Sequence, residues 1–326
     1  MSVPVLVPGR WVGIDVSKAH LDVALLPENT SFRVSNDPDG WSNLIARITD
    51  ASPPTVVLEA TGSYHGGVTL ALAEAGMPPA VMNPEQTHAF IRSEGQRTKT
   101  DRTDARLLAR FGHQKQPSPS PVLTQNARDL KELVACRDDF TKLLTMEKNR
   151  LHVATARTRS HHQAVIDHLV AERRTVDTEI AGLIASDPEL AARDRIVQSM
   201  PGIGIVLGPV FLAGLAELGQ DHPKALASLA GVAPHIHQSG SRKERGAIRG
   251  GRVTIRKALY QMAVTAVARN PVMKVHFRQL LLRMPYKVAI IACARRMLGI
   301  LNAMVRDGIT WQETTVGQGQ FVPDAA

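Results

Sequence analysis

Four acidic residues are the groups in this sequence best suited to chemistry: Asp15, Glu59, Asp101 and Asp104. Asp15 follows the apolar run 11–14 and Glu59 ends the β-branched run 55–58, so each is expected at the end of a buried strand. Asp101 and Asp104 open a segment with helical apolar spacing, which puts both on one face of a helix. Two strand ends and a helix start can therefore bring the four carboxylates together.

Carboxylates gathered at one point repel one another unless protons or cations neutralise them. A pair of Mg²⁺ ions suits oxygen ligands, and ions roughly 3.5 to 4 Å apart can activate an attacking oxygen and stabilise a leaving one at phosphorus. Each acid alone could be a solvated surface group, and Asp101 could simply cap its helix. Because Asp15 and Glu59 fall where strands would bury them, the four together predict a metal-dependent phosphodiester site.

The elements that must position these acids alternate between strand and helix. Apolar patterning predicts strands at about 11–17, 21–26 and 31–35, a helix at 41–48, a strand at 55–59, a helix at 66–75, a strand at 80–83 and a helix after Pro84. This β-β-β-α-β-α-β-α order resembles an RNase H fold of the RuvC-like type. The proline-rich segment 115–121 then interrupts regular structure, as a linker would.

The segment from Ala127 to about Ile184 has no proline and reads as two long helices. Apolar residues recur there at spacings of three and four, and Arg137 and Glu147 interrupt the first stripe. Such helices can pack as an antiparallel hairpin, form a dimer interface, or do both. Three nearby histidines share no spacing with a carboxylate or cysteine, so they are not expected to bind metal; they are His161, His162 and His168.

Positive charge is concentrated near the carboxyl end of the chain. The formal net charge is +9, yet residues 239–306 contain fifteen Lys or Arg and one acidic residue, Glu244. A block this one-sided predicts nucleic acid binding, and the low aromatic content of 4% argues against recognition by base stacking. Arginines in 242–251 are expected to contact phosphates rather than read bases.

The two cysteines, Cys136 and Cys293, lie far apart, without the spacing of a zinc site or a disulfide framework. The sequence has no uninterrupted run of about 18 apolar residues, and its first ten residues lack the pattern of a signal peptide. We therefore expect a cytoplasmic protein that does not enter a membrane.

A third region begins at Asp187-Pro188. Within it, Pro201-Gly202-Ile203-Gly204 resembles a helix-hairpin-helix turn, whose glycine amides can approach DNA phosphates without sequence preference. A glycine-rich turn that serves packing alone is an equal alternative. The expected organisation is thus an α/β domain at 1–126, a helical coiled-coil segment at 127–186 and a mainly helical domain at 187–326.

Several short motifs, in this order, resemble the DEDD-type transposases of the insertion sequence 110 family, with its 1111 subgroup included. The matching segments span roughly residues 15–260, and together they are far more specific than any one alone. They are Gly13-Ile14-Asp15-Val16-Ser17-Lys18, Leu58-Glu59-Ala60-Thr61-Gly62, Lys99-Thr100-Asp101-Arg102-Thr103-Asp104-Ala105, Pro201-Gly202-Ile203-Gly204, and the block from Ala230-Gly231 to Ser239-Gly240.

The resemblance implies a site-specific DNA recombinase that excises and inserts its own element. Its RuvC-like domain would hold Mg²⁺ on the four acids, and its C-terminal transposase domain would supply a serine nucleophile, which the motif places at Ser239. Family members use a non-coding bridge RNA, encoded by the element, to pair with donor and target double-stranded DNA. They assemble as tetramers or dimers of dimers, in which one subunit's serine can complete another's acidic site.

Other interpretations of the same residues stay open from the sequence. Ser239 could belong to an ordinary Gly-Ser loop, and Ser241 is a competing nucleophile two residues away. A junction-resolving nuclease would use the four acids to activate water, but it leaves Ser239 and the basic region unexplained. An actin-like kinase or ATPase should have a second phosphate loop, and none follows residue 127. A basic architectural protein would be favoured by loss of an acid, yet all four motif positions are filled.

Overall fold

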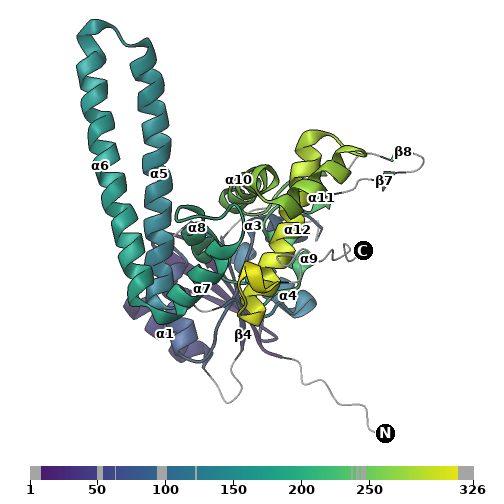
Figure 1. Ribbon diagram of the computed structural model, residues 1–326. Helices are drawn as coiled ribbons and strands as arrows, with labels where there is room; N and C mark the ends of the chain where they lie inside the picture. Colours follow the sequence, from purple (N-terminus) through teal and green to yellow (C-terminus); the bar gives the residue numbers. More distant parts are fainter. Residues whose placement is uncertain are drawn as a thin grey trace. The chain divides into compact units, whose positions relative to one another are not determined.

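The computed structural model describes residues 9–49, 54–62, 64–93, 101–121, 123–235, 238–239, 242–243 and 247–314; within these ranges, the side chains of 101–103, 235, 238–239, 242–243 and 313 are not described. The chain divides into two compact units, Met1–Val122 and Leu123–Ala326. Figure 1 shows the elements of both units, and each unit is described by itself.

The first unit contains a five-stranded mixed sheet with the strand order β3-β2-β1-β4-β5. The strands β1, β2 and β3 form an antiparallel meander, whereas β4 runs parallel to β1 and β5 runs parallel to β4. The strands are β1 (Trp11–Val16), β2 (His20–Leu26), β3 (Thr30–Ser35), β4 (Thr55–Glu59) and β5 (Ala80–Met82). This mixed α/β arrangement is consistent with the predicted RNase H-like domain.

Helices cover both faces of this sheet. On one face, α1 (Pro38–Ile48) and α2 (Gly66–Glu74) bury Leu44 and Leu72 against β1 side chains such as Ile14. On the other, α3 (Pro84–Ser93) and α4 (Asp101–Lys115) bury Phe90 and Phe111 against Trp11 and Val57. Strand side chains alternate between faces, so the residues two positions after Gly13 and Val57 also face α3 and α4. Those residues are Asp15 and Glu59.

The first helix begins earlier than the predicted residue 41. Its N-cap is Asp37, whose carboxylate accepts a hydrogen bond from the Gly40 amide at 2.8 Å, and Pro38 occupies its first turn. Proline suits that position because its missing N–H has no partner at a helix start. The residues just before the predicted helix are therefore the first turn of α1.

The second unit begins with two long helices that form an antiparallel hairpin. They are α5 (Gln125–Val153) and α6 (Ala156–Ser186), and Figure 1 shows them side by side along their length. The charged residues that interrupt the apolar stripe are both buried and partnered. Glu147 accepts from Arg150 and lies 2.9 Å from Nδ1 of His162, and Arg137 lies 3.6 Å from Asp177. An intramolecular hairpin is thus confirmed, whereas coiled-coil packing stays a prediction.

The hairpin is linked to the next helices by a hydrogen bond from Arg137 Nη2, near the middle of α5, to the Val206 carbonyl, 2.8 Å long. A large apolar core follows, which includes Phe211, Leu259 and Met262. It is built from α7 (Pro188–Ser199), α8 (Leu207–Gly214), α9 (Pro223–Leu229), α10 (Val253–Arg269), α11 (Pro271–Leu281) and α12 (Tyr286–Asp307), with a final 3-10 turn at Trp311–Glu313.

Of the helices that the structure describes, α12 alone has the length and apolar composition to cross a membrane. Half of its most apolar stretch is buried within the protein. It also buries Asn302, whose amide accepts from the Gly219 amide at 2.6 Å and donates to the Asp221 carbonyl at 2.9 Å. These contacts make α12 a core helix of the second unit.

Candidate active site

The helix α4 lies directly on the backbone of β1. A Cβ atom placed on Gly13 would be 2.1 Å from the carbonyl oxygen of Ala105 and 2.3 Å from the amide nitrogen of Ala109. A Cβ atom on Gly112 would be 2.6 Å from the Trp11 ring. These distances are well inside van der Waals contact, so glycine is required at both positions for the helix and strand to pack this closely.

The same contacts fix the direction of α4. Ala105 lies against Gly13, whereas Gly112 lies against Trp11, so the helix runs antiparallel to the strand. Its first turn therefore points toward the carboxyl end of β1. This turn carries Asp104, which is partly buried, and it begins at Asp101, whose side chain lies outside what the structure describes.

The two strand acids lie at the same end of the sheet. The parallel pairing of β1 and β4 ends with Ile14 opposite Leu58, and one further step along both strands reaches Asp15 and Glu59. Neighbouring strands are about 4.8 Å apart, and both side chains face α3 and α4. The strand ends and the start of the helix therefore lie at one edge of the sheet, and this edge carries Asp15, Glu59 and Asp104. That these acids form one metal site stays a prediction.

Two side chains of α3 contact the Glu59 carboxylate. The buried Thr87 hydroxyl donates a short hydrogen bond to Glu59 Oε2, and His88 Nε2 lies 3.8 Å from Oε1. These contacts limit the rotation of a carboxylate at a strand end. Neither residue stands out in the sequence, because Thr87 lies 28 positions from Glu59 along the chain and His88 follows it.

A further acidic residue, Asp22 on the neighbouring strand β2, lies beside Asp15. The register of β1 and β2 puts Asp22 directly opposite Asp15. Asp22 is buried, and Arg33 binds both of its oxygens, with Nη2 2.7 Å from Oδ2 and Nε 3.1 Å from Oδ1. A bidentate guanidinium satisfies most of the carboxylate's acceptor capacity. Asp22 is therefore neutralised by Arg33 and was also missed by the sequence analysis.

The donor set at this edge suits a hard divalent cation, because carboxylate oxygens are the ligands such ions prefer. Among the side chains that the structure describes, no group of three His, Cys, Asp or Glu is close enough to hold a metal ion. The fourth expected ligand, Asp101, is not in that set. Asp15, Glu59 and Asp104 are in that set, so these three share an edge of the sheet without being close enough to hold an ion together. The residues present fit the predicted ion by donor chemistry.

The candidate nucleophile belongs to a different part of the chain. The short strands β6 (Pro234–His235) and β9 (Ala247–Ile248) pair antiparallel, and β7 (Gln238–Ser239) and β8 (Arg242–Lys243) form a second antiparallel pair. The backbone of Ser239 is opposite Arg242, and its side chain is not described. Ser241 lies outside the described residues.

The four short strands β6 to β9 are named the β-arm. Glycines and arginines hold the residues on either side of it. Gly231, with φ of +69°, leaves room for the Gly250 carbonyl, which a Cβ atom would approach to 2.4 Å. Arg256 donates to that carbonyl at 2.6 Å, and Arg252 holds Glu217 through two hydrogen bonds of 2.6 and 2.7 Å. Two basic residues of the positive region therefore hold the protein's own backbone and acids.

Comparisons with known proteins agree with this arrangement. Residues 12–158 match a family model of DEDD-type IS110 transposases, and residues 194–278 match the model described as the transposase IS116/IS110/IS902 family. The chain is 30% identical over 311 residues to the pilin gene-inverting protein of Moraxella bovis, covering 91% of this chain and 95% of that protein. The chain belongs to the IS110 family of transposases. It is therefore an enzyme of a DNA strand-transfer family.

Two further relatives are similar to the chain over most of its length. The pilin gene-inverting protein of Moraxella lacunata is also 30% identical over 311 residues, with 91% of this chain and 95% of that protein covered. An uncharacterized 42 kDa protein of insertion element IS900 from Mycobacterium paratuberculosis is 25% identical over 391 residues, with 94% and 98% covered. Membership in the IS110 family implies that DNA is the substrate, and a DEDD-type domain is consistent with use of a divalent metal.

Proposed function

We propose that this IS110 family transposase cuts and rejoins DNA with Ser239 as nucleophile, at a site where Asp15, Glu59, Asp101 and Asp104 hold two Mg²⁺ ions. One observation carries the metal part of the proposal. The antiparallel packing of α4 on β1 directs the first turn of the helix to the strand ends that carry Asp15 and Glu59. Hard oxygen donors on rigid elements suit this cation.

The chain's own residues would divide the work in a simple way. Thr87 holds Glu59 in place, and Arg33 keeps the neighbouring Asp22 neutral, so the charge of the site comes from the four DEDD acids. Bound Mg²⁺ would lower the cost of deprotonating a hydroxyl nucleophile and stabilise charge on the leaving oxygen. The four acids would hold the Mg²⁺ ions in place before the DNA enters.

The serine step conserves a phosphodiester bond. The Ser239 oxygen forms a bond to the scissile phosphorus, the bond from phosphorus to the leaving nucleotide oxygen breaks, and the serine proton is passed to solvent or to the leaving oxygen. The DNA is then attached through phosphoserine. A hydroxyl of a second strand can displace the serine in the reverse reaction, so strands are rejoined without ATP.

Two further parts of the proposal are supported by the family resemblance. An element-encoded bridge RNA would pair with donor and target DNA, and four subunits, or two dimers, would assemble around them. The names of the Moraxella relatives refer to inversion of a gene segment. Inversion, excision and insertion all need the same cutting and rejoining of two duplexes, so one active site can serve all three.

The deciding experiment is a denaturing gel with labelled element-junction DNA, the flanking non-coding RNA and Mg²⁺. Wild-type protein should give a labelled band at the mass of protein plus DNA. Ser239→Ala should abolish that band, whereas the matched variant Ser241→Ala should retain it. Free nicked DNA from all three proteins would show that water is the nucleophile, as in a junction-resolving nuclease.

The acids are tested by Asp15→Asn and Asp104→Asn in the same assay. Both substitutions keep the side-chain volume and remove the charge that the ions need. We expect strand cleavage to fall by more than about a hundredfold, while affinity for DNA stays close to wild type. Loss of binding in parallel with loss of cleavage would show that the carboxylates serve the fold instead.

A further inference from the structure

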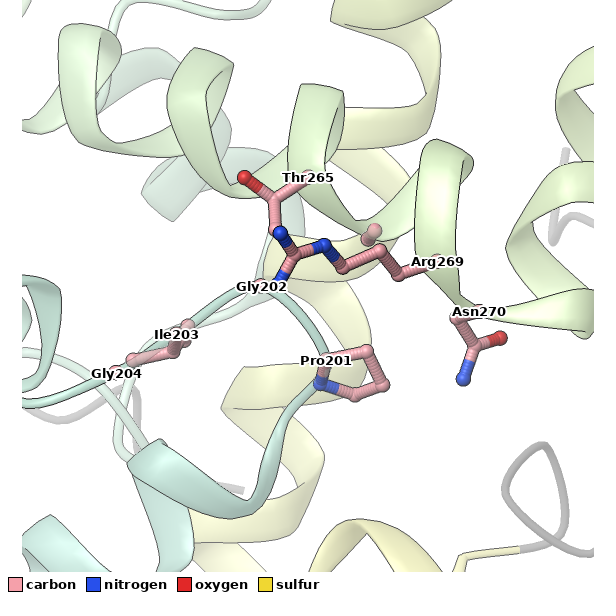
Figure 2. Close-up of a pocket in the computed structure, with 8 residues that line it drawn as sticks. Pro201, Gly202, Ile203, Gly204, Thr265, Arg269 and Asn270 are labelled. Carbon is pink, nitrogen blue, oxygen red and sulfur yellow. The ribbon is translucent and has the colours of Figure 1, made fainter.

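A pocket of about 360 Å³ lies in the second unit between the turn that joins α7 to α8 and the last turn of α10. Figure 2 shows the Arg269 side chain extending from the end of α10 across this turn, with its guanidinium group beside Thr265 and Gly202. None of the lining residues is acidic. They are Pro201, Gly202, Ile203, Gly204, Thr265, Ala266, Arg269 and Asn270.

Arg269 supplies the positive charge that lines this pocket. Arg269 is exposed, and among the described residues its guanidinium group has no hydrogen bond or ion pair. This distinguishes Arg269 from Arg252 and Arg256, which hold their own unit together. A planar guanidinium at the mouth of a pocket without acids is suited to a phosphate, which it can bind through two parallel hydrogen bonds.

Asn270 adds a second favourable contribution at the same place. Its side-chain oxygen accepts a hydrogen bond from the Met273 amide at 3.1 Å and thereby caps α11, a helix of 11 residues. The amino group of the same amide is left as a donor at the pocket edge. The positive end of α11 therefore starts beside Arg269, where it favours a negative charge.

The two glycines of the turn differ in what the protein requires of them. Gly202 has a φ of +92°, and a Cβ atom there would lie 2.3 Å from the Met262 carbonyl, so the fold needs glycine. Gly204 is exposed, and a Cβ atom there would meet nothing within 4 Å. Packing therefore does not account for glycine at 204. Gly204 lines the pocket beside Arg269, so the absence of a side chain there leaves its backbone open to a group that enters the pocket.

We infer that this pocket binds a phosphate of duplex DNA, held by Arg269 and by the backbone of the Gly202–Gly204 turn. The inference rests on the proposed function, which supplies DNA as the ligand, and it names a contact made by residues other than the DEDD acids. Contacts to phosphates position a duplex without reading its sequence. Such binding orients the DNA for the reacting groups whatever its sequence.

The test is fluorescence anisotropy of a labelled DNA duplex over a series of salt concentrations, with Arg269→Ala and Gly204→Ala. Each variant should bind about tenfold more weakly than wild type, as loss of one charged hydrogen-bonded contact predicts. Arg269→Ala should also lower the salt slope by about one. Combining both substitutions should cost little more than either alone, because both act on one phosphate.

Matched controls separate this contact from general effects. Arg174→Ala removes an exposed charge from α6, and Gly182→Ala adds a methyl group where nothing lies within 4 Å. Both should bind DNA as wild type does, and all four variants should keep the wild-type Tm within a few degrees.

The outcomes distinguish this inference from the proposed function. Steep, salt-dependent binding by wild type that is unchanged in Arg269→Ala and Gly204→Ala would overturn the pocket and leave the transposase proposal standing. Failure of wild type itself to bind DNA would instead contradict the proposed function. Weakening confined to an RNA duplex of the same sequence would overturn DNA as the occupant.

Discussion

Two side chains of α3 contact the carboxylate of Glu59. Thr87, which is buried, donates a hydrogen bond to one of its oxygens, and His88 lies near the other. Partners of this kind orient a metal ligand and are commonly worth a factor of 10 to 100 in activity. Thr87 does not touch the reacting atoms, so it is a positioning residue.

Thr87→Val tests this role because valine has nearly the same shape and no hydroxyl. We expect DNA cleavage to slow by about tenfold and the Mg²⁺ concentration for half-maximal activity to rise. Thr87→Ser, which restores the hydroxyl, should recover most of the rate. A Thr87→Val enzyme with the wild-type Mg²⁺ dependence would mean that Glu59 is oriented without Thr87.

Asp194 is a different kind of acidic residue, with no role in the site. Its Oδ1 is buried and, among the described residues, has no hydrogen-bond partner, while Gln198 donates to Oδ2. Burial raises the pKa of this carboxyl above its ordinary value. A folded-state pKa above the unfolded one means that its contribution to stability is fully present below the unfolded pKa and is lost as pH rises through the folded pKa.

Asp194→Asn should therefore raise the Tm at pH 7, by about 2 to 4 °C for a gain of about 1 kcal/mol. The advantage should shrink as the pH is lowered through the raised pKa of Asp194, because the wild-type carboxyl group becomes protonated there. Thermal melts of both proteins across this pH range measure the difference. An advantage that is the same at every pH would show that the charge is not its cause.

At the scale of elements, the site depends on how closely α4 approaches β1. Gly13 and Gly112 together allow a helix backbone to lie on a strand backbone, and this contact sets where the first turn of α4 ends. A side chain at either position would push the helix outward. The position of the acids on α4 therefore depends on two glycines, which have no side chain of their own.

Gly13→Ala is expected to destabilise the first unit by about 1 to 3 kcal/mol, because a methyl group must displace the Ala105 carbonyl. Cleavage should fall with it. Gly182→Ala in α6 is the matched control, and its open surroundings predict a gain of about 0.5 to 1 kcal/mol. Denaturant unfolding measures both. Wild-type stability in Gly13→Ala would contradict the close approach.

Much of the first unit could be predicted from the chain. All five strands were placed to within one residue, since their apolar runs are bounded by clear turns. The start of α1 was missed because Asp37 and Pro38 are as typical of a turn as of a helix cap. The apolar core helix α12 was expected only as part of a mainly helical domain at 187–326, and its bounds were not predicted.

The acids of the candidate site could be singled out from the sequence, but the residues that contact them could not. Asp15, Glu59 and Asp104 follow from local pattern, which a sequence displays directly. The partners Thr87 and Arg33 depend on pairings between separate elements, which spacing along the chain does not reveal. Gly13 could have been noticed, because a glycine inside a strand often marks close approach of another backbone.

At the scale of the whole molecule, the charge of region 239–306 is only partly available to a ligand. Arg252 and Arg256 are occupied by Glu217, by backbone carbonyls and by the packing of the β-arm. The number of phosphates that this region can neutralise is therefore smaller than the fifteen basic residues suggest. The excess of positive charge still predicts strongly electrostatic binding.

DNA affinity should consequently fall steeply with salt. Contact with 6 to 10 phosphates predicts a loss of about 10³ to 10⁵ in affinity between 50 and 200 mM salt. The slope of log K against log salt concentration, measured by anisotropy with the full chain, gives the number of contacts. A nearly flat slope would exclude the basic region as the main DNA surface.

The hydrogen bond from Arg137 to the Val206 carbonyl connects the helical hairpin to the segment that precedes α8. Sixteen residues separate Arg137 from Val153 at the tip, which is about 24 Å of continuous helix. Val206 immediately precedes α8, two residues after the glycine turn at Gly204. One hydrogen bond therefore connects the middle of α5 to the residue before α8, two positions from the pocket that we propose binds a phosphate.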